Sequence, residues 1–199
     1  MSEAVLKSYS DIPLNEREVF RYMSCKCPDE QTKKLFSRCI SECESVLSYK
    51  ACFCEFPLVF SGDEIDLSFA KTKSKSLSVN LRGCVKVILF AATIGHGMDR
   101  LIKAQSLVSP AKAVCLQAIG SERVESLCDT LNDELKEQYK KQGFNLKPRF
   151  SPGYGDLPLL LQREIFSALN CRKLLGISLG ENLMMTPSKS VTAIIGVYE

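Results

Sequence analysis

The sequence has a single histidine, no tryptophan and few cysteines at metal-binding spacing. A structural zinc site usually needs two close pairs of cysteine or histidine ligands, and His96 cannot form such a cluster alone. Of the ten cysteines, only Cys25 and Cys27, and Cys52 and Cys54, form close pairs, and neither pair has CxxC spacing. We therefore expect free thiols rather than a metal centre.

Signals for membranes, secretion and nucleic acids are also weak. No stretch reaches the roughly 20 apolar residues that span a bilayer, and the N-terminus lacks the apolar core of a secretion signal. The 26 basic and 23 acidic residues are spread along the chain. We therefore expect no large positive electrostatic field that would attract nucleic acid. Lys71, Lys73 and Lys75 have no aromatic residues between them for base stacking and predict a solvated loop. We expect a cytoplasmic protein with reduced cysteines and with neither a membrane nor a nucleic-acid partner.

What is present is the composition of an ordinary globular domain. The chain has 199 residues, of which 45% are hydrophobic and 25% are charged. A chain of this length can bury one sizeable core. We expect a single domain over residues 1–199, with N-terminal helices in 1–49 and a sheet and a ligand loop in 50–199.

The hydrophobic periodicity predicts a mixture of helices and strands. Asn15 is a plausible N-cap for a short opening helix, and a longer amphipathic helix follows over Asp29–Leu47. Further helices are predicted over Met98–Leu107, Ala111–Gln142 and Leu159–Leu169. Strands are predicted over Lys50–Phe60, Ile65–Phe69, Cys84–Thr93 and Ser190–Tyr198. Because this order lacks a regular βαβ repeat, it predicts the α+β class.

The segment Lys147–Asp156, KPRFSPGYGD, is the richest in binding chemistry. Its prolines stiffen the loop, and its glycines let the backbone approach a ligand closely. Arg149 can hold a carboxylate through paired hydrogen bonds, Tyr154 can stack on a nucleoside, and free amides near Ser151 and Gly153 can read polar edges. The residues alone equally allow a tight surface turn in which Arg149 is solvated and Tyr154 merely packs.

Three linked stretches resemble the C-terminal half of the activation domain of cobalamin-dependent methionine synthase. They are RFSPGYGD, LPLLLQREIFSALN and GISLGENLMMTPSKSVTAIIG. Upstream, FPLVFSGDEIDL and ILFAATIG resemble a hairpin and the central strand of that family, so the resemblance covers about residues 50–198. It implies a twisted, mainly antiparallel sheet flanked by helices.

The resemblance also implies a site for S-adenosylmethionine. In the family an RxxPGY loop binds this ligand, so Arg149 is expected to engage the methionine carboxylate. The backbone of Ser151, with Gly153 beside it, is expected to contact the ligand, and Tyr154 is expected to lie against the nucleoside.

At two carboxylate positions the chain matches the family pattern less well than it does in the loop. Where the family has Thr-Glu-Ser, this chain has Gly180-Glu181-Asn182, which leaves Glu181 but removes the hydroxyls. The family also has a carboxylate that is expected to face the ligand's amino group. The corresponding position in this chain lies near Arg123 to Ser126, and the adjacent candidates are Glu122 and Glu125.

The implied activity is methyl transfer from S-adenosylmethionine to a reduced cobalamin. This reaction needs alignment more than acid or base assistance, so a site without histidine or metal is sufficient. The cobalamin is expected on a separate partner, a methionine synthase or another corrinoid protein, with a flavodoxin-like protein as a candidate electron donor. A non-catalytic S-adenosylmethionine sensor and a purely structural subunit remain alternatives, so whether the chain is part of an enzyme stays open.

Three further groups invite functional interpretation. His96 projects between two glycines but is expected to pack in its loop, and Asp99 suits the first turn of a helix. Met184 and Met185 are expected to pack in the core, with contact to a corrin as the alternative. Cys171, beside two cationic residues, is the one candidate for a reactive thiolate.

Overall fold

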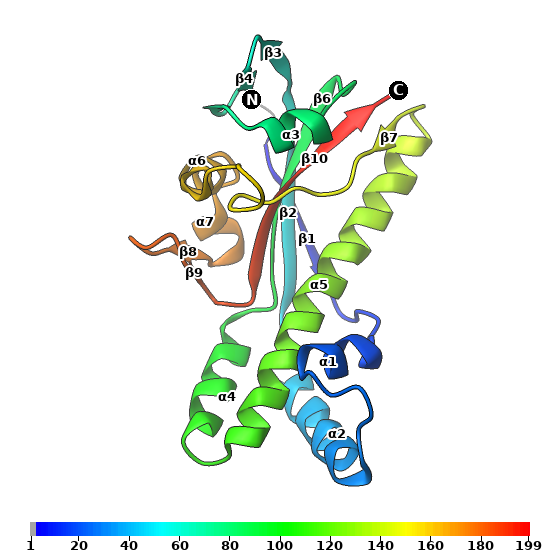
Figure 1. The fold of residues 1–199 in the computed structure, drawn as a ribbon, viewed down its shortest axis with the longest axis vertical. Helices are drawn as coiled ribbons and strands as arrows, with labels where there is room; N and C mark the ends of the chain where they lie inside the picture. The colour runs from blue at the N-terminus through cyan, green and yellow to red at the C-terminus, as the bar shows by residue number, and fades with distance from the viewer. Residues whose placement is uncertain (1–2) are drawn as a thin grey trace.

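A five-stranded antiparallel sheet forms the centre of the computed structural model, which describes residues 3–199 (Figure 1). Its strands lie in the order β1, β2, β6, β10 and β7. They span Val5–Tyr9, Tyr49–Pro57, Lys86–Thr93, Ser190–Tyr198 and Asn145–Leu146, respectively. Every neighbouring pair is antiparallel. The predicted α+β class and mainly antiparallel sheet are therefore confirmed.

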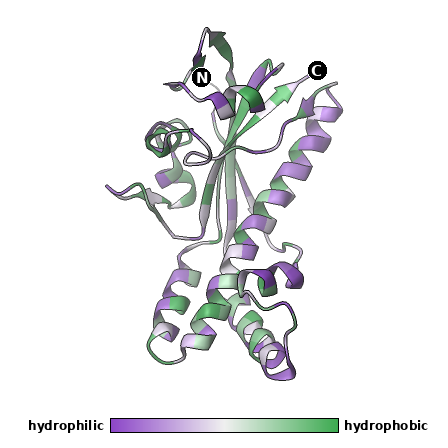
Figure 2. Cartoon of the chain, viewed as in Figure 1, coloured by the Kyte–Doolittle hydropathy of each residue, from purple (hydrophilic) through white to green (hydrophobic). Residues whose placement is uncertain are grey.

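Both faces of the sheet are covered, as strand β6 shows most clearly. Ile88 and Phe90 point to a core built with α1, α2, α4 and α5. The alternate residues Val87 and Leu89 point to a second core built with α3, α6 and α7. In Figure 2 hydrophobic residues gather in the central strands, whereas the upper turns of α5 are mostly hydrophilic. The continuous apolar run of the sequence is thus a strand buried on both sides.

The predicted long helices are present, with boundaries close to the expected ones. Helix α1 (Glu16–Tyr22) begins after Asn15, whose side chain accepts a hydrogen bond from the Glu18 amide. Helix α2 spans Glu30–Glu44, α4 spans His96–Ser106, and α5 spans Pro110–Lys140. The segment predicted over Leu159–Leu169 is a short 3-10 turn followed by α6 (Gln162–Ala168).

Several elements differ from the sequence-based expectation. Strand β1 lies in the stretch expected to be helical, because pairing with β2 rather than local propensity determines its structure. The lysine-rich stretch holds strand β5 (Lys71–Thr72) and helix α3 (Lys75–Asn80) instead of a loop. Helix α7 (Cys171–Leu175) was not predicted.

Two small sheets complete the fold. Strands β3 (Val59–Ser61), β4 (Glu64–Asp66) and β5 form a three-stranded sheet, and the β3–β4 turn contains Gly62 with φ of +62°. Strands β8 (Ser178–Leu179) and β9 (Met185–Thr186) form a hairpin. Within residues 3–199, no helix is long and apolar enough to cross a membrane.

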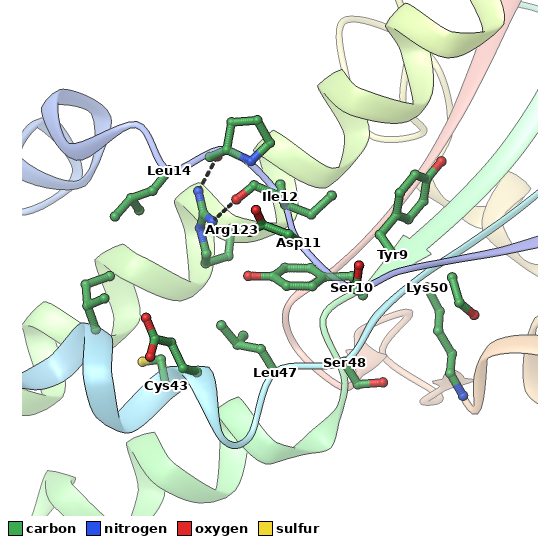
Figure 3. Close-up of a pocket in the computed structure, with 15 residues that line it drawn as sticks. Tyr9, Ser10, Asp11, Ile12, Leu14, Cys43, Leu47, Ser48, Lys50 and Arg123 are labelled. Atoms are coloured by element: carbon green, nitrogen blue, oxygen red, sulfur yellow. Dashed lines mark hydrogen bonds between the residues drawn. The ribbon is translucent and has the colours of Figure 1, made fainter.

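The segment between β1 and α1 borders a cleft of about 690 Å³ (Figure 3). Its other walls are the end of α2 and the start of β2, with Cys43, Leu47 and Ser48 among the lining residues. Arg123, from α5, also lines the cleft. This segment therefore connects the sheet, α2 and α5.

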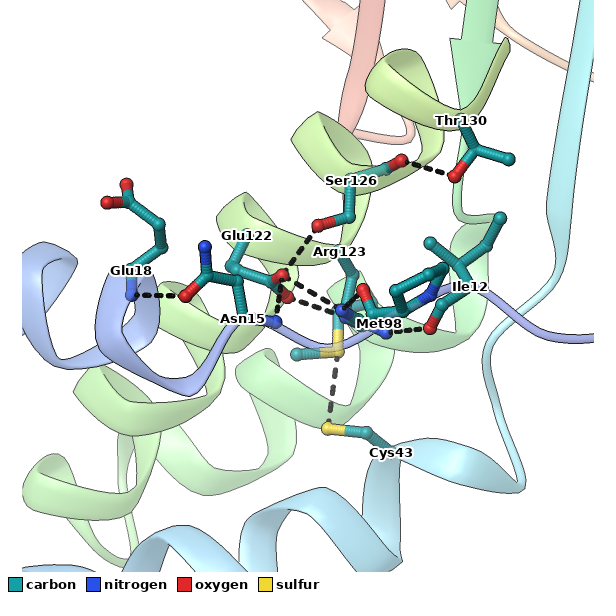
Figure 4. A network of polar contacts seen from close by, with 10 residues as sticks. Ile12, Asn15, Glu18, Cys43, Met98, Glu122, Arg123, Ser126 and Thr130 are labelled. Carbon is teal, nitrogen blue, oxygen red and sulfur yellow. Dashed lines mark hydrogen bonds and ion pairs between the residues drawn. The ribbon is translucent and has the colours of Figure 1, made fainter. Parts of the chain in front are cut away.

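A buried ion pair holds that segment against α5 (Figure 4). The side chains of Glu122 and Arg123 are only 2% and 6% exposed, and Arg123 Nε donates to Glu122 Oε2 over 2.6 Å. Arg123 also donates to the carbonyls of Ile12 (2.7 Å) and Pro13 (2.5 Å). Glu122 Oε1 accepts from the Asn15 amide over 2.8 Å. The pair thus fixes the chain just before α1.

Replacing Arg123 with methionine is expected to lower the free energy of unfolding by roughly 3–5 kcal/mol, since it leaves a buried carboxylate unpaired. Urea denaturation measures the effect. Arg82→Met, at an exposed position, is the matched control and should change stability little. The double change Glu122→Gln with Arg123→Met should recover much of the loss, because no charge is then left buried. A loss below about 1 kcal/mol in Arg123→Met would contradict the role given to the pair.

Candidate functional site

Arg149 is positioned by backbone pairing along the edge of the sheet. The Lys147 amide donates to the Gly196 carbonyl over 2.8 Å, and Phe150 and Ile194 exchange hydrogen bonds of 2.8 and 2.9 Å. Successive residues of an extended segment point to opposite faces. Phe150 accordingly enters the core near α3 and α6, and Arg149 points toward α5.

The Arg149 guanidinium is held by two carboxylates of α5. Its Nη2 donates a hydrogen bond to Glu125 Oε2 over 2.7 Å. Its Nη1 lies 2.9 Å from Asp129 Oδ1, but this ion pair lacks the geometry of a hydrogen bond. The two acidic residues are four apart, so they lie on the same face of the helix. The Arg149 side chain is 26% exposed, whereas those of Glu125 and Asp129 are 42% and 68% exposed. Of the two carboxylates, Asp129 is the more accessible to solvent.

These residues line a cleft of about 350 Å³ between α1, α5 and the segment after β7. The lining residues are Asn15, Glu18, Arg21, Tyr22, Glu122, Glu125, Ser126, Asp129 and Arg149. A shallower groove of about 610 Å³ adjoins it and shares Asn15, Ser126 and Asp129. The volume of the first cleft lies within the range of small-molecule sites.

Helix α1 supplies an aromatic wall that the sequence did not reveal. Burial, and next the charge of Glu125, raise the pKa of the Tyr22 hydroxyl above its usual value. Arg21 forms an ion pair with Glu18 and lies 4.8 Å from the centre of the Tyr22 ring. Only the packing of α1 on α5 brings Tyr22 near Arg149, and no local motif marks it.

The two candidate glutamates of α5 have different roles. Glu122 accepts hydrogen bonds from Arg123, from the Asn15 amide and from Ser126 Oγ, the last over 2.6 Å. Its lone pairs are largely used within the protein. Glu125, which sequence reasoning placed beside the ligand's amino group, is the glutamate that meets Arg149. The structure therefore brings two of the predicted site residues together.

The rest of the predicted loop turns away from this cleft. Tyr154 is 70% exposed, and its ring packs edge-on against Phe150 with the centroids 5.3 Å apart. Ser151, Gly153 and Tyr154 are not among the residues that line the Arg149 cleft. Their predicted contacts with a ligand stay predictions.

One expectation about the loop amides is wrong. The Gly153 amide donates to the Leu157 carbonyl over 2.9 Å, and the Tyr154 amide donates to the Ser151 carbonyl over 3.1 Å. Tight turns of this kind satisfy their own backbone groups. The Gly153 amide is therefore not free to donate a hydrogen bond to a ligand.

Asp156 anchors the loop, which the sequence did not indicate. Its carboxylate accepts from Ser74 Oγ (2.5 Å) and from the amides of Lys75 (2.7 Å) and Ser76 (3.0 Å). The Ser74 hydroxyl and these amides hold the pKa of the Asp156 carboxyl well below its usual value. The loop is thereby tied to the start of α3, on the face of the sheet opposite Arg149.

Glu181 lies apart from the Arg149 cleft. It is exposed in the turn of the β8–β9 hairpin, which Figure 1 places on the other side of the sheet from α5. It is not among the residues that line the cleft. Its role as a ligand contact stays a prediction.

Most of the other residues singled out in the sequence contact the rest of the protein. His96 Nε2 lies 3.2 Å from the Gly176 carbonyl, as expected for loop packing, and Asp99 accepts from the Ser188 amide and hydroxyl. Met184 is exposed, contrary to expectation, whereas Met185 packs against the second core.

Cys171 is not a reactive thiolate. It is fully buried, and a hydrogen bond with Cys52, together with burial, raises the pKa of its thiol. All ten cysteines are free thiols. Within residues 3–199, no group of three histidine, cysteine, aspartate or glutamate residues could hold a metal ion.

Comparison with known proteins rests on structure alone. No family model matches the chain, and no curated protein matches it. A solved structure described as "Crystal Structure of the MetH Reactivation Domain bound to AdoHcy" superposes with a TM-score of 0.70 at 16% sequence identity. The match covers 97% of this chain and 78% of the other. The chain therefore has the fold of the methionine synthase reactivation domain, as the RFSPGYGD resemblance predicted.

Proposed function

We propose that this chain binds S-adenosylmethionine in the Arg149 cleft. One observation supports this most directly: in a fold whose solved example is bound to AdoHcy, Arg149, Glu125, Asp129 and Tyr22 meet in one cleft. A guanidinium suits the carboxylate of an amino acid, and carboxylates suit its ammonium group. A tyrosine ring offers a surface for a nucleoside.

The ligand's amino-acid end is assigned to Arg149 and Glu125. Arg149 binds the carboxylate, and Glu125 accepts hydrogen bonds from the ammonium group. Ser126 also lines the cleft, and its hydroxyl donates to Glu122.

The nucleoside is assigned to the Tyr22 ring of the same cleft. The backbone of Ser151 and the ring of Tyr154 stay proposed contacts for a part of the ligand that extends beyond the cleft, whereas the Gly153 amide, which donates to Leu157, is not one of them.

The proposed role is to present the methyl group of this ligand to a reduced cobalamin held by a separate methionine synthase or corrinoid methyltransferase. The methyl group passes from the sulfonium sulfur to cobalt, the sulfur keeps the electron pair of the broken bond, and a one-electron reductant first supplies the reduced cobalt. A flavodoxin-like protein is the proposed reductant. The residues of this chain bind and orient the donor, and no proton has to be moved.

Arg149→Ala is expected to weaken S-adenosylmethionine binding by about 1.5–3 kcal/mol, or roughly 10- to 150-fold. Arg149 is partly exposed, so its loss should leave the fold intact. Isothermal titration calorimetry measures the affinity, and Arg163→Ala, at an exposed position on α6, is the matched control. Equal affinities for the native protein and Arg149→Ala would place the ligand elsewhere.

A methylation assay tests the activity itself. Free cobalamin, a one-electron chemical reductant and S-adenosylmethionine are mixed with and without the protein, and methylcobalamin formation is followed by visible absorption. We expect a faster rate with the native protein, and a rate near background with Arg149→Ala at subsaturating ligand. Binding without any rate increase would instead support the sensor function, and no binding would support a structural subunit.

A further inference from the structure

A separate cleft of about 530 Å³ adjoins the second core, on the face of the sheet opposite Arg149. Its walls are α6, α7, the end of β2 and the β4–β5 turn, and Figure 1 places α6 and α7 on the other side of the sheet from α5. Helix α6 contributes Glu164, Ser167 and Ala168, which share one side of the helix because they are three and four residues apart. The volume lies within the range of small-molecule sites.

Two aromatic rings form an apolar part of this lining. Phe56 and Phe69 pack with their ring centroids 4.9 Å apart and an interplanar angle of 63°. Hydrogen bonds of Ser68 fix the turn that carries Phe69. The Ser68 amide donates to Asp66 Oδ1 over 2.8 Å, and its hydroxyl donates to the Pro57 carbonyl over 3.4 Å. This surface is therefore preformed, which lowers the ordering cost of binding an apolar group.

Glu164 brings an unsatisfied carboxylate oxygen to the same cleft. Its Oε2 is buried and has no hydrogen-bond partner in the part of the chain that the structure describes. A buried polar atom without a partner costs free energy, and a charged one costs more. An ammonium group would supply both the missing donor and a compensating charge.

Lys173 adds a positive charge to the lining of this cleft. It is exposed, and none of the ion pairs among residues 3–199 includes Lys173 or Glu164. The cleft thus combines one carboxylate, one ammonium and an aromatic surface, and none of the three charged or apolar groups is committed to another function. This set is complementary to a zwitterion with an apolar side chain.

We propose that this cleft binds a small apolar amino acid. The ammonium of the ligand pairs with Glu164, its carboxylate pairs with Lys173, and its side chain packs on Phe56 and Phe69. The site is independent of the proposed S-adenosylmethionine site, because the two clefts share no residue and lie on opposite faces of the sheet.

Calorimetry on the full chain with three probes of the same apolar body tests the proposal. The probes are L-phenylalanine, phenethylamine, which lacks the carboxylate, and hydrocinnamate, which lacks the ammonium. L-phenylalanine should bind most tightly. Phenethylamine should bind about two- to fivefold more weakly, since it loses only the exposed Lys173 contact. Hydrocinnamate should bind at least about tenfold more weakly, because it leaves Glu164 unpaired.

Glu164→Gln separates ligand binding from a structural role. It should weaken L-phenylalanine binding about tenfold or more, since the ion pair with the ammonium is lost. Its midpoint of urea denaturation should equal or exceed the native value, because the variant removes a buried charge that has no partner in the free protein. Glu137→Gln, at an exposed position on α5, is the matched control and should change neither quantity.

Three results would overturn the proposal. They are no binding of L-phenylalanine at millimolar concentrations, hydrocinnamate binding as tightly as L-phenylalanine, and an affinity that Glu164→Gln leaves unchanged. Arg149→Ala tests which cleft is used. L-phenylalanine binding that is lost in Arg149→Ala and kept in Glu164→Gln would place the amino acid in the Arg149 cleft instead.

Discussion

The buried contact between Glu122 and Arg123 is the constraint on which the site depends. It draws the carbonyls of residues 12 and 13 and the Asn15 amide onto α5, one residue before α1 begins. The position of α1, and with it the Tyr22 wall of the cleft, follows from that attachment. Burial works to lower the pKa of Arg123, but the hydrogen bonds and charge of Glu122 outweigh it and raise the pKa, so Arg123 stays charged.

Two neighbouring ion-pair systems on α5 therefore serve different purposes. The Glu122–Arg123 system is shielded from water and has its hydrogen-bonding groups satisfied within the protein, which makes it rigid. The Glu125–Arg149–Asp129 system, within two turns of the same helix, is partly exposed and linked by single contacts. Exchanging a partner is costly in the first system and inexpensive in the second. Helix α5 thus carries a fixed, buried ion pair beside a partly exposed one.

Sequence reasoning succeeded where the signal was local and failed where it depended on distant pairing. The strand predicted over Cys84–Thr93, the Asn15 cap and the long helix predicted over Ala111–Gln142 rest on local patterns, and each is present in the structure. Strand β1 has only five residues, and its pairing with β2 determines its structure. Its own residues therefore did not predict a strand.

The same distinction applies to the site. Arg149 and Glu125 were candidates that the family resemblance implied, and the structure places the two in contact. Tyr22 and Asp129 come from other parts of the sequence, and only the packing of α1 and of the segment after β7 on α5 brings them to Arg149. Glu181 is attached to a hairpin on the other side of the sheet, a separation that a motif in the linear sequence does not record.

The backbone around Arg149 explains how its partners could change without the site losing its shape. Hydrogen bonds from residues 147 and 150 to β10 fix the main chain on both sides of Arg149, and Asp156 ties the following loop to α3. None of these contacts involves Glu125 or Asp129. In the proposed complex, a ligand carboxylate would therefore replace one of them at the guanidinium while the sheet edge stays in place. Such preorganisation lowers the ordering cost of binding, so more of the interaction energy appears as affinity.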